Sequence, residues 1–197
     1  MAVLHTIALP GSGAPAAGFE APFEMLAACH ERVERMLALM ARLRQHLLDK
    51  GGDDAARQAA IDVMRYFDQA APLHHQDEEL HVFPALLATA DARVKGVVGQ
   101  LLEDHRQMEA LWADVRSALQ AVVGAADTAP PADGAPQAAA FALSAGQLSA
   151  MDRFNALYQR HLQDEDGTVY PAAQAVIDAP ARQKMGEDMM VRRGVRL

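Results

Sequence analysis

Residues 74–84 read HHQDEELHVFP, and residues 161–171 read HLQDEDGTVYP. Each position of the second stretch lies 87 residues after its match in the first, without a gap. Both stretches contain a histidine, a glutamate four residues later and a proline six residues beyond the glutamate. These residues are His74, Glu78 and Pro84 in the first copy and His161, Glu165 and Pro171 in the second. Two copies of a metal-ligand pattern in one register predict a shared chemical role.

Helix geometry explains the spacing between the histidine and the glutamate. Residues four apart on a helix lie on the same face, with Cβ atoms roughly 5–6 Å apart, so one helix can offer both side chains to a metal. The repeat also decides between neighbouring candidates. His75 follows His74, but the second copy has Leu162 at that position. The shared register therefore selects His74, and by the same comparison Glu78, as the ligands.

The composition predicts a helical protein and excludes several classes of partner. Hydrophobic residues make up 51% of the chain but aromatic residues only 5%, a mixture rich in Ala, Leu and Met that favours helices. The net charge is −8 and no basic stripe is present, so we expect no nucleic acid as a partner. No apolar run approaches the roughly 18–20 residues of a membrane helix. The single cysteine fits a reducing, cytoplasmic setting.

Four long amphipathic segments are predicted, and each carries one histidine within its apolar stripe. They cover approximately residues 20–50, 53–89, 91–123 and 137–166, and the stripe histidines are His30, His74, His105 and His161. Four such segments predict an all-α, antiparallel up-down-up-down four-helix bundle. We expect a flexible arm at residues 1–18, the bundle at 19–178 with a linker at 124–136, and a tail with a short helix at 179–197.

Two glutamates in these stripes require positive charge beside them. Burying a carboxylate without a partner costs several kcal/mol, and no Lys or Arg lies nearby in the same stripes. Four imidazoles and two carboxylates are too many ligands for a structural zinc site and too rich in nitrogen for calcium or magnesium. The set suits a pair of iron or manganese ions bridged by Glu78 and Glu165, with solvent in the remaining positions.

Three further residues are candidates for additional ligands or for hydrogen-bonding partners of the histidines. Glu34 and Glu109 lie four residues after His30 and His105, although we favour positions beside the stripe that face solvent. Tyr158 lies one turn before His161, where lining a pocket and packing in the core are equally good interpretations. The remaining histidines, His5, His46, His75 and His81, are expected at the surface.

The order H, H-x3-E, H, H-x3-E, with FP and YP closing the two repeats, resembles the hemerythrin-like HHE cation-binding family. The resemblance covers residues 22–178 and implies a non-haem di-iron centre held by His30, His74, Glu78, His105, His161 and Glu165. It implies two iron ions, bridged by the two carboxylates and by an oxo or hydroxo group, with manganese or zinc less favoured. Oxygen-carrying hemerythrins have a second histidine four residues after the first on the third helix, and here that position is Glu109. Family members without that histidine are linked to oxygen or nitric oxide sensing, iron homeostasis and iron–sulfur repair.

We therefore expect a protein that binds or senses a small ligand, dioxygen or nitric oxide, or responds to redox state. A site rich in histidine and poor in carboxylate is less suited to driving dioxygen to high-valent iron, which favours binding over catalysis. Two alternatives stay open: a di-iron oxidase, peroxidase, nitric-oxide-reducing or repair-type enzyme, and a module for iron storage or sensing.

Overall fold

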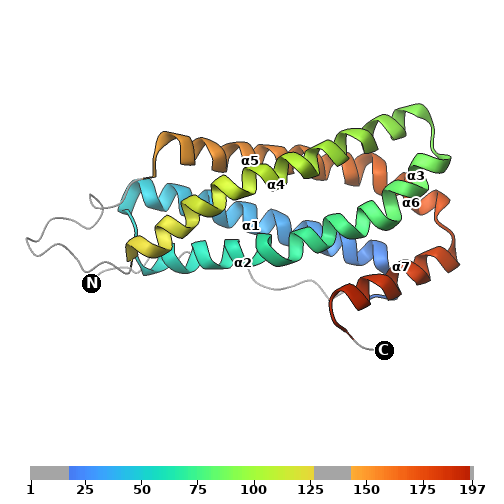
Figure 1. Cartoon of the computed structure of the whole chain (residues 1–197), viewed down its shortest axis with the longest axis horizontal. Helices are drawn as coiled ribbons and strands as arrows, with labels where there is room; N and C mark the ends of the chain where they lie inside the picture. Colours follow the sequence, from blue (N-terminus) through green and yellow to red (C-terminus); the bar gives the residue numbers. More distant parts are fainter. Residues whose placement is uncertain (1–17, 127–142, 196–197) are drawn as a thin grey trace, which may run out of the picture.

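The computed structural model describes residues 18–126 and 143–195, all of them in helices or in short connections between helices. The long helices run side by side as rods, and the shorter helix α7 lies at one end (Figure 1). In chain order the elements are α1 (Pro22–Lys50), α2 (Asp54–Asp77), η1 (Glu78–Val82), α3 (Phe83–Thr89), α4 (Ala92–Ala126), α5 (Ala145–Asp164), η3 (Glu165–Val169), α6 (Tyr170–Val176) and α7 (Ala179–Arg192). The predicted all-α four-helix bundle is confirmed, and the described residues form no strand.

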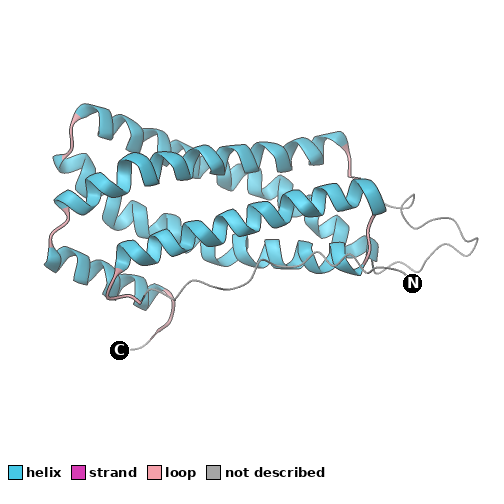
Figure 2. Ribbon diagram, turned by 180° about the vertical axis from the view of Figure 1, so that it is seen from behind, coloured by secondary structure: helices cyan, strands magenta, loops and turns pink. Residues whose placement is uncertain are grey.

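Local chemistry determines where the rods begin and end. Pro22 occupies the first turn of α1, where its missing N–H leaves no helical bond unmade. Gly51 ends α1 with a φ of 79°, a conformation that favours glycine. Asp53 caps α2 by accepting a hydrogen bond from the backbone N–H of Ala56 at 2.8 Å. The reversal between α1 and α2 therefore needs only three residues, which makes the two helices antiparallel neighbours (Figure 2).

The fourth rod starts later than the sequence suggests. Residues 137–142, where we expected its first turns, lie outside the described residues, as do residues 1–17 of the expected arm and 127–136 of the expected linker. Within the described part, α5 starts at Ala145. Ser144 and Gln147 form a reciprocal capping box there, in which each side chain bonds the other residue's backbone N–H.

A feature that the sequence did not reveal is a π-helical turn in each repeat, η1 and η3. In each turn a backbone N–H bonds the carbonyl five residues back: Phe83 bonds Glu78, and Tyr170 bonds Glu165. Each wide turn joins the glutamate of a repeat to its closing aromatic residue and proline. The second and fourth rods consequently continue through α3 and α6 without a break in direction, and π-turns of this kind are frequent at functional sites.

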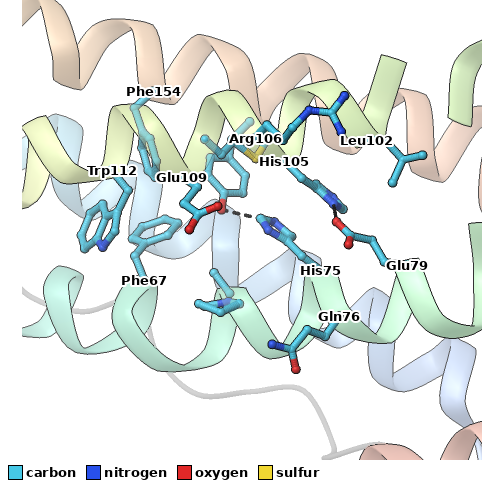
Figure 3. Close-up of a pocket in the computed structure, with 14 residues that line it drawn as sticks. Phe67, His75, Gln76, Glu79, Leu102, His105, Arg106, Glu109, Trp112 and Phe154 are labelled. Atoms are coloured by element: carbon cyan, nitrogen blue, oxygen red, sulfur yellow. Dashed lines mark hydrogen bonds and ion pairs between the residues drawn. The ribbon is translucent and has the colours of Figure 1, made fainter. Parts of the chain in front are cut away.

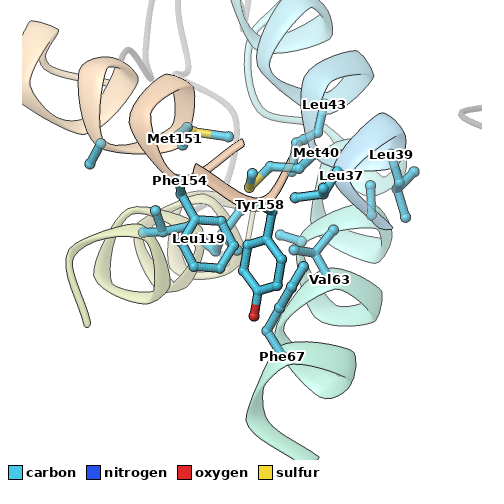
Figure 4. Close-up of a cluster of buried hydrophobic side chains, with 14 of the residues drawn as sticks. Leu37, Leu39, Met40, Leu43, Val63, Phe67, Leu119, Met151, Phe154 and Tyr158 are labelled. Carbon is cyan, nitrogen blue, oxygen red and sulfur yellow. The ribbon is translucent and has the colours of Figure 1, made fainter. Parts of the chain in front are cut away.

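Two apolar clusters fill the bundle. The larger surrounds Phe67, Phe154 and Tyr158 and includes Leu43 and Leu119 (Figure 4). The second lies toward the other end of the rods and contains Phe23, Val82, Leu101, Tyr170 and Met185. Along each rod the stripe histidine falls between residues of the two clusters, as His30 does between Leu26 and Val33. The four stripe histidines therefore form a polar layer across the bundle, with one apolar cluster on each side of it along the rods.

Helix α7 packs against this second end of the bundle. Met185 and Met189 are fully buried there, and Arg192 and Arg193 reach Asp77 on α2 at 2.5 Å and 2.6 Å. Asp77 is itself fully buried, so α7 supplies the cations that its carboxylate needs. Throughout residues 18–126 and 143–195, each helix is too short or too polar to span a bilayer.

Candidate metal centre

Six side chains from the four rods meet in the layer between the two apolar clusters. Glu78 and Glu165 are fully buried, and the four stripe histidines are at most 5% exposed. The side-chain donor atoms form two groups, each with all its atoms within 4.8 Å of one another. One group contains His30, His74, Glu78 and Glu165, and the other contains His105, His161, Glu78 and Glu165. Each histidine pair belongs to one group, and both carboxylates belong to both groups.

Glu165 lies between the two histidine pairs with one oxygen toward each. Its Oε2 lies 3.2 Å from His30 Nε2, and its Oε1 lies 3.0 Å from His161 Nε2. Glu78 repeats the arrangement, with Oε1 at 3.5 Å from His74 Nε2 and Oε2 at 3.6 Å from His105 Nε2. A carboxylate placed in this way can bridge two ions, one beside each histidine pair.

The nitrogens within each pair are also spaced as ligands of one ion. His30 and His74 bring their Nε2 atoms to 3.1 Å, and His105 and His161 bring theirs to 3.2 Å. Two nitrogens bound at right angles to an ion at about 2.1 Å lie roughly 3 Å apart. Both oxygens of Glu165 and Oε2 of Glu78 lack a well-oriented hydrogen bond although they are buried. Such atoms are costly to bury, and cations at the two positions would satisfy them.

Carboxylates outside the cluster orient two of the imidazoles. Asp166 lies 2.9 Å from His30 Nδ1, and Glu79 lies 2.7 Å from His105 Nδ1. A histidine that donates its Nδ1–H to an acid presents Nε2 to the cluster as a free base, which is the usual arrangement around a metal-bound histidine. His161 Nδ1 has Asp104 at 3.6 Å, a longer approach. The donor set, its geometry and its supporting acids all fit a metal ion.

The sequence matches the Hemerythrin HHE cation binding domain family over residues 21–173, more than three quarters of the chain. The chain belongs to the hemerythrin HHE family. It is also 27% identical over 175 residues to an uncharacterized protein of Haemophilus influenzae, a match that covers 89% of this chain and 91% of that protein. Family membership together with the buried His/Glu cluster makes this a metal-binding, hemerythrin-like protein.

The closing aromatic residue of each repeat covers one histidine of this hemerythrin-like site. Tyr170 stacks on His30 with ring centroids 4.9 Å apart, and Phe83 stacks on His105 at 5.6 Å. The Tyr170 hydroxyl also lies 2.9 Å from His30 Nε2 and donates to Glu78 Oε1 at 2.5 Å. Phe83 has no hydroxyl, so only the half of the site that contains His30 and His74 has this donor.

The electrostatics of the hemerythrin-like site show how the chain balances its buried acids without an ion. Burial by itself lowers the pKa of His30, but its hydrogen bond to Asp166 and its ion pair with Glu165 prevail and raise the pKa to about 9. Burial likewise opposes the charge of His161, yet Glu165 and Asp104 raise that pKa to about 9. At neutral pH both are imidazolium ions, so protons stand in for cations in the two halves of the site.

The two glutamates respond to the same cluster in opposite directions. Burial acts to raise the pKa of Glu165, but the charges of His161 and His30 overcome it and hold the pKa well below its ordinary value. For Glu78, burial and the nearby charge of Glu165 raise the pKa well above its ordinary value. Burial and the charge of His30 lower the pKa of His74. The metal-free site therefore carries one carboxylate anion and two imidazolium cations.

The three additional candidates from the sequence, Glu34, Glu109 and Tyr158, lie in different surroundings. Glu34 is exposed on α1 and is not one of the clustered side chains, which agrees with the solvent-facing position favoured from the sequence. Glu109 is also exposed, but it lines a cavity beside His105. Tyr158 is buried, and its hydroxyl lies 3.4 Å from Nε2 of His75, so it both packs in the core and lines that cavity.

The prediction that His46, His75 and His81 lie at the surface is wrong in each case, while His5 lies outside the described residues. His46 is buried and pairs with Asp53 at 2.9 Å, and His81 is partly buried near Asp188. His75 is partly buried and stacks on His105 with centroids 3.9 Å apart and ring planes 11° apart (Figure 3). The repeat comparison excluded His75 because Leu162 does not share its chemistry.

One cavity, of about 350 Å³, lies between α2, α4 and α5 and adjoins the site (Figure 3). His75, His105 and Glu79 line it on the side of the cluster, and Phe67 and Trp112 line it on the apolar side. It reaches the half of the site that contains His105 and His161. Of the six clustered side chains, His105 is the one that lines this cavity.

Proposed function

We propose that this protein binds two iron ions, bridged by Glu78 and Glu165, and uses them to bind or sense dioxygen, nitric oxide or redox state. The observation that carries the proposal is the placement of the two carboxylates. Each has one oxygen toward the pair His30 and His74 and the other oxygen toward the pair His105 and His161, so neither half of the site has a carboxylate of its own. A single-ion site has no use for two acids shared in this way.

The residues of the chain have distinct tasks in the proposed site. When bound, a pair of iron ions supplies redox activity and open positions for a small ligand. The four imidazoles hold the ions through Nε2, while Asp166 and Glu79 fix the rings of His30 and His105 by accepting from Nδ1. Tyr170 donates a hydrogen bond to Glu78 and fixes that carboxylate. The apolar clusters exclude bulk water from the layer.

The balance of donors favours binding over oxidation. Four neutral imidazoles and two carboxylates give the two ions little negative charge, and negative ligands are what stabilise iron in high oxidation states. The outer acids Asp166 and Glu79 are more than 40% exposed, so solvent screens their contribution. We therefore place ligand binding or sensing ahead of an oxidase, a peroxidase or a nitric-oxide-reducing enzyme.

The test uses untagged protein expressed with added iron. We expect about two iron ions per chain by elemental analysis, with near-ultraviolet and visible charge-transfer bands in air that change when azide is added. Absence of a transition metal after iron supplementation would overturn the proposal, and one tightly bound ion per chain would overturn the bridged pair. Sustained consumption of hydrogen peroxide or nitric oxide, in place of a stable adduct, would assign the enzyme function instead.

A further inference from the structure

The cavity between α2, α4 and α5 has a wall of four aromatic rings (Figure 3). They belong to Phe67, Trp112, Phe154 and Tyr158. Phe67 lies at the centre of this group, because its ring centroid is 5.2 Å from that of Trp112 and 5.0 Å from that of Phe154. The centroid of the Tyr158 ring lies 5.4 Å from that of Phe67. The rings hold one another in place, so the wall is organised in advance for a bound molecule.

Trp112 offers its ring to this cavity, because its N–H group already has a partner elsewhere. The indole N–H donates to Asp68 Oδ1 at 2.9 Å, and Arg116 Nε donates to the same oxygen at 2.9 Å. Neither Asp68 nor Arg116 lines the cavity. A molecule in the cavity therefore meets the aromatic ring of Trp112. Tryptophan is the aromatic side chain that attracts cations most strongly.

The charged side chains at the cavity leave an excess of negative charge. Glu79, Glu109 and Arg106 line it. Arg106 is paired outside the cavity, since it donates to Glu103 at 2.9 Å through Nε and at 2.7 Å through Nη2. Glu79 accepts from His105 Nδ1 at 2.7 Å. In the described part of the chain Glu109 forms no ion pair, and it extends from α4 beside the aromatic wall (Figure 3). Glu109 is therefore the acid that is open to a cation.

We propose that this cavity binds a small organic cation, a protonated amine that carries a single ring or a short apolar group. The apolar part lies against Phe67 and Trp112, and the ammonium group lies beside Glu109. Aromatic rings attract a cation, and the carboxylate supplies its counter-charge. The net charge of the chain, −8, favours the approach of cations in general.

The size of the cavity agrees with this class of ligand. Its volume of about 350 Å³ lies at the lower end of the range for cavities that bind small molecules, and it accommodates one ring with a short substituent. The cation site does not depend on the two proposed iron ions. Of their six proposed ligands, His105 alone lines the cavity.

The test uses Trp112 as its reporter, because the chain contains a single tryptophan. Three ring-matched probes are titrated at pH 7: benzylamine, which is protonated, benzyl alcohol, which is neutral, and benzoate, which is an anion. We expect a saturable change in tryptophan emission, half-complete at a concentration at least about threefold lower for benzylamine than for benzyl alcohol. We expect benzoate to bind most weakly of the three. Equal binding of the amine and the alcohol, tighter binding of benzoate, or no saturable change with benzylamine would each overturn the proposal.

The same titration on iron-loaded and on chelator-treated protein separates this site from the metal centre. We expect benzylamine to bind with the same affinity in both forms, because the aromatic wall and Glu109 belong to the chain. Binding that is confined to the iron-loaded protein would show that the amine binds a metal ion and would overturn the proposal.

A charge-removing variant tests the role of the carboxylate. Glu109 is exposed, so Glu109→Gln keeps the fold, and we expect it to weaken the binding of benzylamine about threefold to tenfold while that of benzyl alcohol stays the same. Asp114→Asn is the matched control, because Asp114 is an exposed acid of the same helix that does not line the cavity. It should bind all three probes as the wild type does. Unchanged binding of benzylamine by Glu109→Gln would overturn the proposed recognition of a cation.

Discussion

Asp166 and Glu79 show how single residues complete this site. Both are acids that directly follow a cluster glutamate, and each reaches a histidine on a different rod, His30 or His105. Their positions match across the two repeats, so the signal was present in the sequence. The sequence alone does not give these acids a role, because an acid beside a ligand on a helix points about 100° away from that ligand. Only the neighbouring rod shows which side chain the acid meets.

The sharpest prediction at the residue scale concerns the shared carboxylate. Glu165→Gln removes a negative charge that both ions use, so we expect the iron content to fall from about two ions per chain to below one. Elemental analysis and competition with a chelator measure the loss. Glu34→Gln is the matched control, because Glu34 has the same spacing from His30 but is exposed. Retention of two tightly bound ions by Glu165→Gln would contradict the bridging role.

The protonation of the metal-free site predicts an alkaline loss of stability. The pKa values of His30 and His161 are about 9 in the folded protein and near 6.5 in the unfolded chain. Between pH 6.5 and pH 9 the folded protein therefore binds more protons at these two residues than the unfolded chain does. The stability from these groups is fully present below pH 6.5 and is lost as the pH rises through 9, by up to about 3 kcal/mol for each imidazole.

Thermal unfolding in a chelator, followed by circular dichroism, checks this expectation. The unfolding midpoint of the metal-free protein should fall by several degrees between pH 6.5 and about 9.5. Iron-loaded protein should lack this fall, because metal-bound imidazoles are already free bases. Parallel curves for the two forms would show that the two histidines are not the groups responsible.

At the scale of elements, the π-turns explain why an aromatic residue and a proline close each repeat. On an α-helix, five residues advance the chain by about 500°, so Phe83 would lie roughly 140° from the direction of Glu78. The wider turn reduces that angle, and both Phe83 and Glu78 are buried. The repeated FP and YP pairs were visible in the sequence, but the hydrogen bonding that they accompany was not.

The start of α5 offers a test of an element boundary. Ser144→Ala removes the side-chain oxygen that accepts from the Gln147 N–H, and we expect a loss of about 1 kcal/mol in the free energy of unfolding. Urea unfolding measures the change. Gln147→Ala removes only the reciprocal bond and should cost less than Ser144→Ala. An unchanged midpoint in Ser144→Ala would show that the cap does not stabilise the helix.

At the scale of the whole molecule, α7 ties the end of the chain to the residue that precedes Glu78. Arg192 and Arg193 satisfy the fully buried Asp77, and Met185 and Met189 complete the second apolar cluster. The sequence predicted a short helix in this region, but its docking required the bundle. The end of the chain therefore stabilises the rod that carries the first repeat.

Removing these cations tests that connection. The double variant Arg192→Ala, Arg193→Ala leaves Asp77 buried without a guanidinium, and we expect a loss of about 3–5 kcal/mol in the free energy of unfolding. Lys184→Ala, on the exposed face of the same helix, should change stability by less than about 0.5 kcal/mol. Urea unfolding compares the two. Equal stability of the double variant and the wild type would contradict a structural role for the docking.

The sequence by itself determined the four rods and the six side chains that meet, because the helical period places a histidine and a glutamate four apart on one face and the repeat selects their register. Only the tertiary structure decided that His75 lies against His105, that Tyr170 bonds Glu78 and that α7 covers Asp77. Those contacts join different rods, and they depend on how far each helix is rotated about its axis. Packing of the whole core determines that rotation, and no local pattern along one helix records it.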